Sequence, residues 1–98
     1  MIYISNSFSM QMVEASNGLI GFKELNKNDF EFETRNAVSV VGHQDTATVL
    51  GVEFNRQNIS LKKGDILFVA QIVGGRLPEG ATKLPDGFKF KFMQVEVL

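Results

Sequence analysis

The chain has 98 residues, of which 44% are hydrophobic, and its length favours one domain with one core. The formal net charge of −1 excludes an overall basic field that would hold a long nucleic acid by counterion release. No cysteine is present, which excludes disulfides, thiolate nucleophiles and cysteine-based zinc sites.

The first half of the chain begins with a strand and becomes harder to interpret. The run "IYIS" at 2–5 predicts a short strand, and "NSFSMQMVEAS" at 6–16 predicts a loop leading into a short helix capped by Ser7 or Ser9. The Asn-Gly pair at 17–18 predicts a turn. The opening residues lack the basic and apolar regions of a secretion signal, and no run is long enough to span a bilayer. We therefore expect a cytoplasmic protein without a membrane partner.

Residues 19–36 allow more than one interpretation. Phe30 and Phe32 alternate with Glu31 and Glu33, as they would in a half-buried strand. The lysines and asparagines around them are equally compatible with an irregular helix or a loop. The sequence leaves these alternatives open.

A helical pattern begins at Asp45, after a strand-like run that ends at a Gly-His pair. Ala47, Leu50 and Phe54 follow the helical spacing i, i+3 and i+7 on one face, and Gly51 is placed to end the helix.

The second half of the chain is rich in strand signals. The run "NISL" at 58–61 predicts a short strand, and "KKGD" at 62–65 predicts a turn into "ILFVAQIV" at 66–73. This last run is apolar almost throughout, so we expect a central strand covered on both faces. A long loop with four glycines and two prolines follows at 74–87, the kind of segment that often carries functional residues.

The C-terminal tail alternates as a strand does, but its phase changes. Phe88, Phe90 and Phe92 occupy even positions, whereas Val95 and Val97 occupy odd ones. A β-bulge near Met93 would reconcile the two halves.

The order of elements predicts a single domain over residues 1–98 of the α/β (α+β) class, with a mixed sheet of about five strands. Polar residues in unusual positions are the candidates for function. Taken one at a time, each has a simpler structural explanation. Asn6 and Ser9 would be turn and cap residues, and Gln71 an amide satisfied by nearby backbone. His43 would be a packed residue beside the helix-cap candidates Asp45 and Thr46.

Several chemistries lack their motifs. One histidine and no cysteine leave only an all-carboxylate metal site, and no acidic cluster has ligand spacing. The "VGGR" segment lacks the spacing and the Lys-Ser/Thr of a P-loop, and there is no dinucleotide fingerprint. Ser9, His43 and Asp45 could form a triad on paper, but the nucleophile elbow is missing. We expect no cofactor.

The same residues taken together resemble a known family. "NSFS", "GHQDT" and "RLPEG" occur in the order seen in the viral ring nucleases, type III anti-CRISPR enzymes of the STIV B116-like domain family, which are small viral and mobile-element proteins. These enzymes destroy cyclic tetra-adenylate, the second messenger of type III CRISPR defence. The resemblance runs from about residue 2 to about residue 80. A viral origin would place this chain in the host cytoplasm.

The resemblance implies a homodimer whose two copies enclose cyclic tetra-adenylate, with the sheet continued across the interface and the helices on one side. It implies catalytic roles for His43, as the general acid, and for Glu79, which would orient Arg76 or the reacting ribose. It implies ligand binding for six further residues: Asn6, Ser9, Thr46, Arg56, Gln71 and Arg76.

Metal-free RNA cleavage is compatible with this residue set. The ribose 2′-hydroxyl serves as an internal nucleophile, so the protein mainly aligns it with the phosphorus and protonates the departing 5′-oxygen. Two other functions stay open. One is a small dimeric DNA-binding regulator that uses the glycine-rich loop and Arg76, and the other is a protein that sequesters the cyclic nucleotide without cleaving it.

Overall fold

The computed structural model describes residues 1–13 and 20–98, and the expected turn at 17–18 lies outside them. The elements in chain order are β1 (Ile2–Ser5), the 3-10 helix η1 (Met10–Met12), β2 (Ile20–Leu25), α1 (Lys27–Glu33), β3 (Val38–Ser39), α2 (Gln44–Leu50), β4 (Ile66–Val73) and β5 (Lys89–Val97). No helix in these residues is both long enough and apolar enough to cross a membrane.

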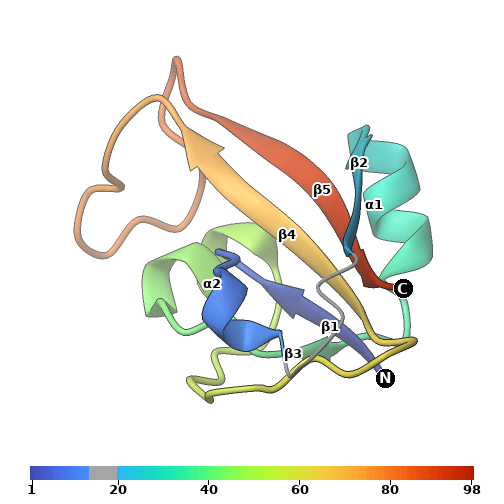
Figure 1. The fold of residues 1–98 in the computed structure, drawn as a ribbon. Helices are drawn as coiled ribbons and strands as arrows, with labels where there is room; N and C mark the ends of the chain where they lie inside the picture. The colour runs from blue at the N-terminus through green and yellow to red at the C-terminus, as the bar shows by residue number, and fades with distance from the viewer. Residues whose placement is uncertain (14–19) are drawn as a thin grey trace.

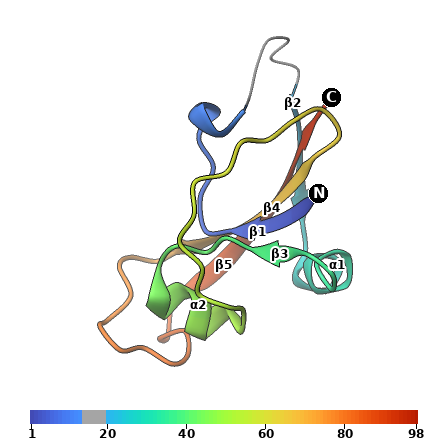
Figure 2. The same cartoon turned by 90° about the horizontal axis from the view of Figure 1, so that it is seen from below.

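The strands of the described residues form one mixed sheet in the order β2-β5-β4-β1-β3 (Figure 1). β1 is parallel to both β3 and β4, whereas β5 is antiparallel to both β2 and β4. Figure 2 shows α1 and α2 on one side of this sheet and η1 on the other. The expected mixed sheet of five strands with its α-helices on one side is confirmed.

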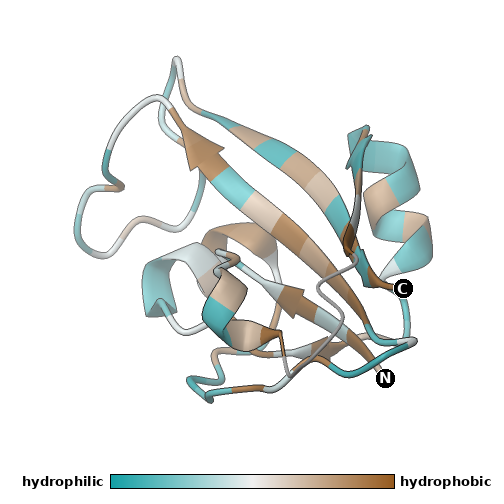
Figure 3. Cartoon of the chain, in the orientation of Figure 1, coloured by the Kyte–Doolittle hydropathy of each residue, from teal (hydrophilic) through white to brown (hydrophobic). Residues whose placement is uncertain are grey.

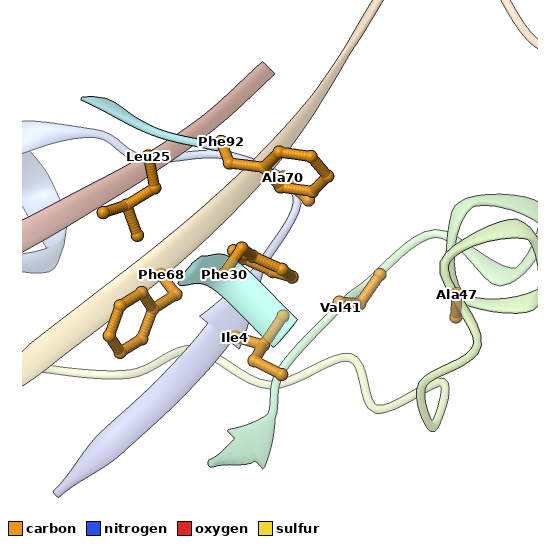
Figure 4. Packing of buried hydrophobic residues seen from close by; sticks show 8 residues of the cluster. All are labelled: Ile4, Leu25, Phe30, Val41, Ala47, Phe68, Ala70 and Phe92. Atoms are coloured by element: carbon orange, nitrogen blue, oxygen red, sulfur yellow. The ribbon is translucent and has the colours of Figure 1, made fainter. Parts of the chain in front are cut away.

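β4 is the central strand, and it is buried on both faces as the sequence predicted. Its apolar residues run along most of its length (Figure 3). Phe68 and Ala70 belong to the helix-side core, which also contains Ile4, Leu25, Phe30, Val41, Ala47 and Phe92 (Figure 4). Leu67 and Val69 belong to the opposite core, which also contains Leu61, Val95 and Val97.

The predicted bulge in the C-terminal strand is wrong. β5 pairs with β4 in one continuous register from Lys89 to Glu96, and with β2 in one register from Phe92 to Val97. Phe90 and Phe92 pack on the helix-side core, while Val95 and Val97 lie in the opposite core. The change of phase therefore marks a change in which face of the strand is covered, and no extra residue is inserted.

The ambiguous segment contains a strand and a helix, so the helical alternative is right for the two phenylalanines. Asn26 caps α1 by accepting a hydrogen bond from the backbone N–H of Asp29 at 2.8 Å. Phe30 is buried, with its ring centroid 4.5 Å from that of Phe92, whereas Phe32 is 61% exposed. A strand would have placed both rings on one face, but the helical turn sends Phe32 to solvent, where the Arg35 guanidinium covers its ring.

Two further expectations are wrong, namely the strand at 58–61 and the place of Phe54 on the helix that begins near Asp45. Residues 58–61 form no strand, because only an isolated bridge joins Leu61 to Val13. α2 ends at Gly51, as predicted, with φ at 81° in the left-handed region that favours glycine. Phe54 is therefore outside the helix, and it forms a parallel bridge with Val41 instead.

One ion pair ties the start of the chain to the start of β4. The N-terminal ammonium of Met1 lies 3.1 Å from Oδ1 of Asp65, and the backbone N–H of Lys62 donates to Oδ2 at 2.9 Å. Burial raises the pKa of the Asp65 carboxyl, but the Lys62 N–H and the hydrogen bond and charge of the amino terminus outweigh it. The pKa of Asp65 therefore lies below its ordinary value.

The lowered pKa makes a prediction about stability. A carboxyl whose pKa is depressed by folding stabilises the protein above its unfolded-state value of about 3.9, and this contribution disappears as the pH falls through the folded-state value. We expect Asp65→Asn to lower the free energy of unfolding by about 1–2 kcal/mol at neutral pH. The difference from wild type should shrink under acid.

Urea unfolding followed between pH 7 and pH 3 measures this effect. Asp86→Asn, at an exposed carboxylate, is the matched control and should follow wild type throughout. A deficit in Asp65→Asn that is the same at both ends of the pH range would contradict the assignment.

Candidate functional site

The candidate residues approach one edge of the sheet because three parallel strands run toward it. Asn6 follows β1, His43 follows the run that contains β3, and Gln71 lies near the end of β4. β1 stands between β3 and β4 in the sheet, so the chain that follows these strands emerges at their shared carboxyl edge. In open α/β sheets, ligands bind at this edge, where connections leave to opposite sides.

His43 caps α2 through its own side chain. The backbone N–H of Thr46 donates to Nδ1 of His43 at 3.2 Å, and Oγ1 of Thr46 lies 3.1 Å from the same nitrogen. The expected cap candidates were Asp45 and Thr46, so the sequence missed the residue that forms the cap. Because Nδ1 accepts from the helix, Nε2 of the exposed His43 ring is the nitrogen that can meet a ligand.

Arg56 lies beside the residue that precedes His43. Its Cγ would be 3.3 Å from a Cβ added at Gly42, so the arginine stem packs against bare backbone. The segment that carries Arg56 is fixed to β3 by Asn55. The backbone N–H of Asn55 donates to the carbonyl of Val41, and its Nδ2 donates to the carbonyl of Ser39, both at 2.9 Å. This attachment holds Arg56 beside Gly42, the residue before His43.

The long loop at 74–87 is tied to the first turn of α2. The backbone N–H of Gly80 donates to Oδ2 of Asp45 at 3.2 Å, and both views show the loop beside α2 (Figures 1 and 2). Glu79 is the neighbour of Gly80 in this loop, and Arg76 precedes it. The base of the loop is closed by Gly74, at φ 128°, where an added Cβ would be 3.0 Å from the Gly87 carbonyl oxygen.

The structure relates the other candidates to this edge by their position in the fold, without a hydrogen bond to His43 in the described residues. Gln71 is exposed on the face opposite the α-helices, since it follows the alternation of Leu67 and Val69. Asn6 is half-buried. Ser9 is the N-cap residue of η1, but its side chain forms no cap hydrogen bond.

The eight candidates therefore differ in how firmly the structure joins them. His43 and Thr46 are in direct contact, Arg56 packs beside Gly42, and Glu79 is brought to α2 by its neighbour Gly80. No side-chain hydrogen bond or ion pair joins Asn6, Ser9, Gln71 or Arg76 to His43 in residues 1–13 and 20–98. The ligand-binding roles of these four residues, and those of Thr46 and Arg56, stay predictions. Asp45 is the residue whose role as a loop anchor the sequence did not indicate.

A separate cavity of about 1080 Å³ lies on the helix side of the sheet, between α1, α2 and the segment 82–92. Phe30, Phe90 and Phe92 are among its lining residues, and none of the eight candidates lines it. The eight candidate side chains therefore lie outside this cavity. In the described parts of the chain, no three histidine, aspartate or glutamate side chains come close enough together to hold a metal ion.

Comparison with known proteins places this arrangement in context. A family model described as STIV B116-like matches residues 2–89. Among solved structures, the chain is similar to B116 of Sulfolobus turreted icosahedral virus, with 20% sequence identity, a TM-score of 0.78, and 97% of each chain covered. This likeness concerns the fold. No curated protein matches the sequence.

Proposed function

The chain belongs to the STIV B116-like family, and we propose that it is a metal-independent ring nuclease that binds and cleaves cyclic tetra-adenylate. The family membership expected from "NSFS", "GHQDT" and "RLPEG" is confirmed; the activity and its role against type III CRISPR signalling are the proposal. The observation that carries it is the geometry of His43. The only histidine of the chain is exposed at the carboxyl edge of the parallel strands, with Nδ1 held and Nε2 available.

The proposed reaction needs only groups that lie near this edge. The ribose 2′-oxygen attacks the adjacent phosphorus and loses its proton, while the bond from phosphorus to the 5′-oxygen breaks. His43, as imidazolium, gives its Nε2 proton to the departing 5′-oxygen and becomes neutral. The carboxylate of Glu79 would receive the proton that the 2′-oxygen loses, and it would also orient Arg76. The products are linear, and each cleaved end carries a 2′,3′-cyclic phosphate.

Binding of a polyanion requires local positive charge, because the net charge of the chain is −1. Arg56 and Arg76 are the cations proposed for phosphate contacts. Arginine suits this role because its guanidinium can form paired, charge-assisted hydrogen bonds to phosphate oxygens.

A homodimer would double these charges, so that two copies of each arginine face the four phosphates of the ring. If two copies joined only through the β2 edge, about nine strand spacings of ~4.8 Å, or roughly 40 Å, would separate the two β3 strands. Enclosure of one ring therefore requires the two-fold axis to lie near the carboxyl edge that carries His43.

We expect light scattering to give twice the mass of one chain. The mass of a single chain, both with and without the ligand, would contradict the dimer.

Cleavage is tested directly with radiolabelled cyclic oligoadenylates. Because the mechanism uses no metal, we expect the same cleavage rate in EDTA as in Mg²⁺, and a 2′,3′-cyclic phosphate product. Loss of activity in EDTA would overturn the mechanism. Binding without any cleavage would favour a sequestering protein, and a gel shift with duplex DNA in place of either would favour the regulator.

The proposed general-acid role of His43 can be separated from its role as a helix cap. Asn is a good N-cap residue, and its Oδ1, like Nδ1 of histidine, is bonded to Cγ, so His43→Asn keeps a cap acceptor without an acid. We expect His43→Asn to reduce single-turnover cleavage by a factor on the order of 10²–10⁴ with ligand affinity nearly unchanged. Arg76→Ala should instead weaken binding, because a phosphate contact exists before the reaction.

His43→Ala is the comparison variant, since it removes the acid and the cap together. It should show the same loss of cleavage and, in addition, a loss of about 0.5–2 kcal/mol of stability. If His43 served only the fold, His43→Asn would melt and cleave like wild type, and the proposed general acid would be wrong.

A further inference from the structure

We propose that Thr46 is a positioning residue that anchors the His43 ring in both of its charge states. The kinetic part of this inference rests on the proposed function. Thr46 is only 5% exposed, so its side chain is directed into the protein, beneath the exposed histidine. The Thr46 hydroxyl lies 3.1 Å from Nδ1 of His43, so in this inference Thr46 acts on a ligand through that ring, in place of the direct ligand contact that the resemblance implies.

Thr46 offers Nδ1 of His43 two hydrogen-bonding partners, of which one can only donate and the other can donate or accept. The backbone N–H, at 3.2 Å, can only donate, and it fits a neutral ring whose Nδ1 has a free lone pair. The hydroxyl, at 3.1 Å, can donate or accept. When the ring carries a proton on Nδ1, the hydroxyl oxygen can accept a hydrogen bond from that N–H, while the backbone N–H cannot.

This pair of partners matches the demands on a general acid. Such a group enters the reaction charged and leaves it neutral, and its donating atom must stay aligned with the leaving oxygen throughout. With Nδ1 engaged in either state, Nε2 points away from the helix in both. The hydroxyl is the part of Thr46 that the charged state needs.

Two matched variants separate the hydroxyl from the volume of the side chain. Thr46→Val keeps the branched shape and removes the hydroxyl, whereas Thr46→Ser keeps the hydroxyl and removes a methyl group. We expect Thr46→Val to reduce single-turnover cleavage about 10-fold to 100-fold with ligand affinity unchanged. Thr46→Ser should stay close to the wild-type rate. The reverse order, with Ser impaired and Val active, would assign Thr46 to packing and overturn the inference.

A double-variant comparison distinguishes positioning from direct ligand contact. A residue that acts only through His43 has no further effect once that ring is gone. In the His43→Asn background, Thr46→Val should therefore leave the residual rate and the ligand affinity unchanged. A further loss in that background would mean that Thr46 contacts the ligand itself, and the inference would be wrong.

A spectroscopic measurement tests the anchor without any activity. His43 is the only histidine, so ¹⁵N-labelled protein gives one imidazole signal set with no assignment problem. Under acidic conditions that charge the ring, the Nδ1 signal of wild type and Thr46→Ser should show a hydrogen-bonded N–H, and Thr46→Val should shift toward a free imidazolium. The Nε2 signal should be the same in all three. An Nδ1 signal that Thr46→Val does not move would refute the anchor, whether or not the protein cleaves cyclic tetra-adenylate.

Discussion

The fold depends on the double burial of β4. Phe68 and Ala70 face one side of the sheet and Leu67 and Val69 face the other, and none of them is more than 3% exposed. Apolar surface of this kind stabilises the fold only when both faces are covered. On one side the cover comes from α1 and α2, through Phe30 and Ala47. On the other it comes from Phe8, Met12, Val13, Ile59 and Leu61, which lie in or beside η1 and in the segment that leads to β4. The parallel strands β1, β3 and β4 run in the same direction, so the residues that follow β1 and β3 emerge beside the last residues of β4, at one edge of the sheet.

The strongly patterned parts of the fold could be predicted from the sequence, whereas the parts that depend on contacts between distant segments of the chain could not. An apolar run of eight residues at 66–73 has few alternatives to a central strand. The bulge predicted in the C-terminal strand is wrong because alternation shows only which face of a strand is buried. That face changes between Phe92 and Val95, while the pairing with β4 stays regular. The pattern at 30–33 was ambiguous because two phenylalanines two positions apart fit a strand, whereas only tertiary packing makes one of them buried and the other exposed.

The candidate site was assembled from residue order, and its internal contacts could not be derived that way. Histidine is not among the preferred N-cap residues, so no propensity indicated that His43 would accept from Thr46 N–H. Nor does any local signal connect Asp45 to Gly80, which are 35 positions apart. The position of Arg56 depends on Asn55 reaching back to β3, again a contact between distant parts of the chain. The order of residues in the sequence indicated which polar side chains are candidates. The strand order of the sheet determines which of them are neighbours.

The first turn of α2 links the stability of this region to its proposed chemistry. A helix of seven residues is marginal by itself, so the cap from His43 and the packing of Ala47 contribute much of what holds it. The same turn holds the imidazole through Thr46 and the glycine-rich loop through Asp45. A change that unwinds this turn would therefore displace the ring and release the loop with Arg76 and Glu79 at once. Substitutions that preserve the cap are for this reason the ones that can report on chemistry alone.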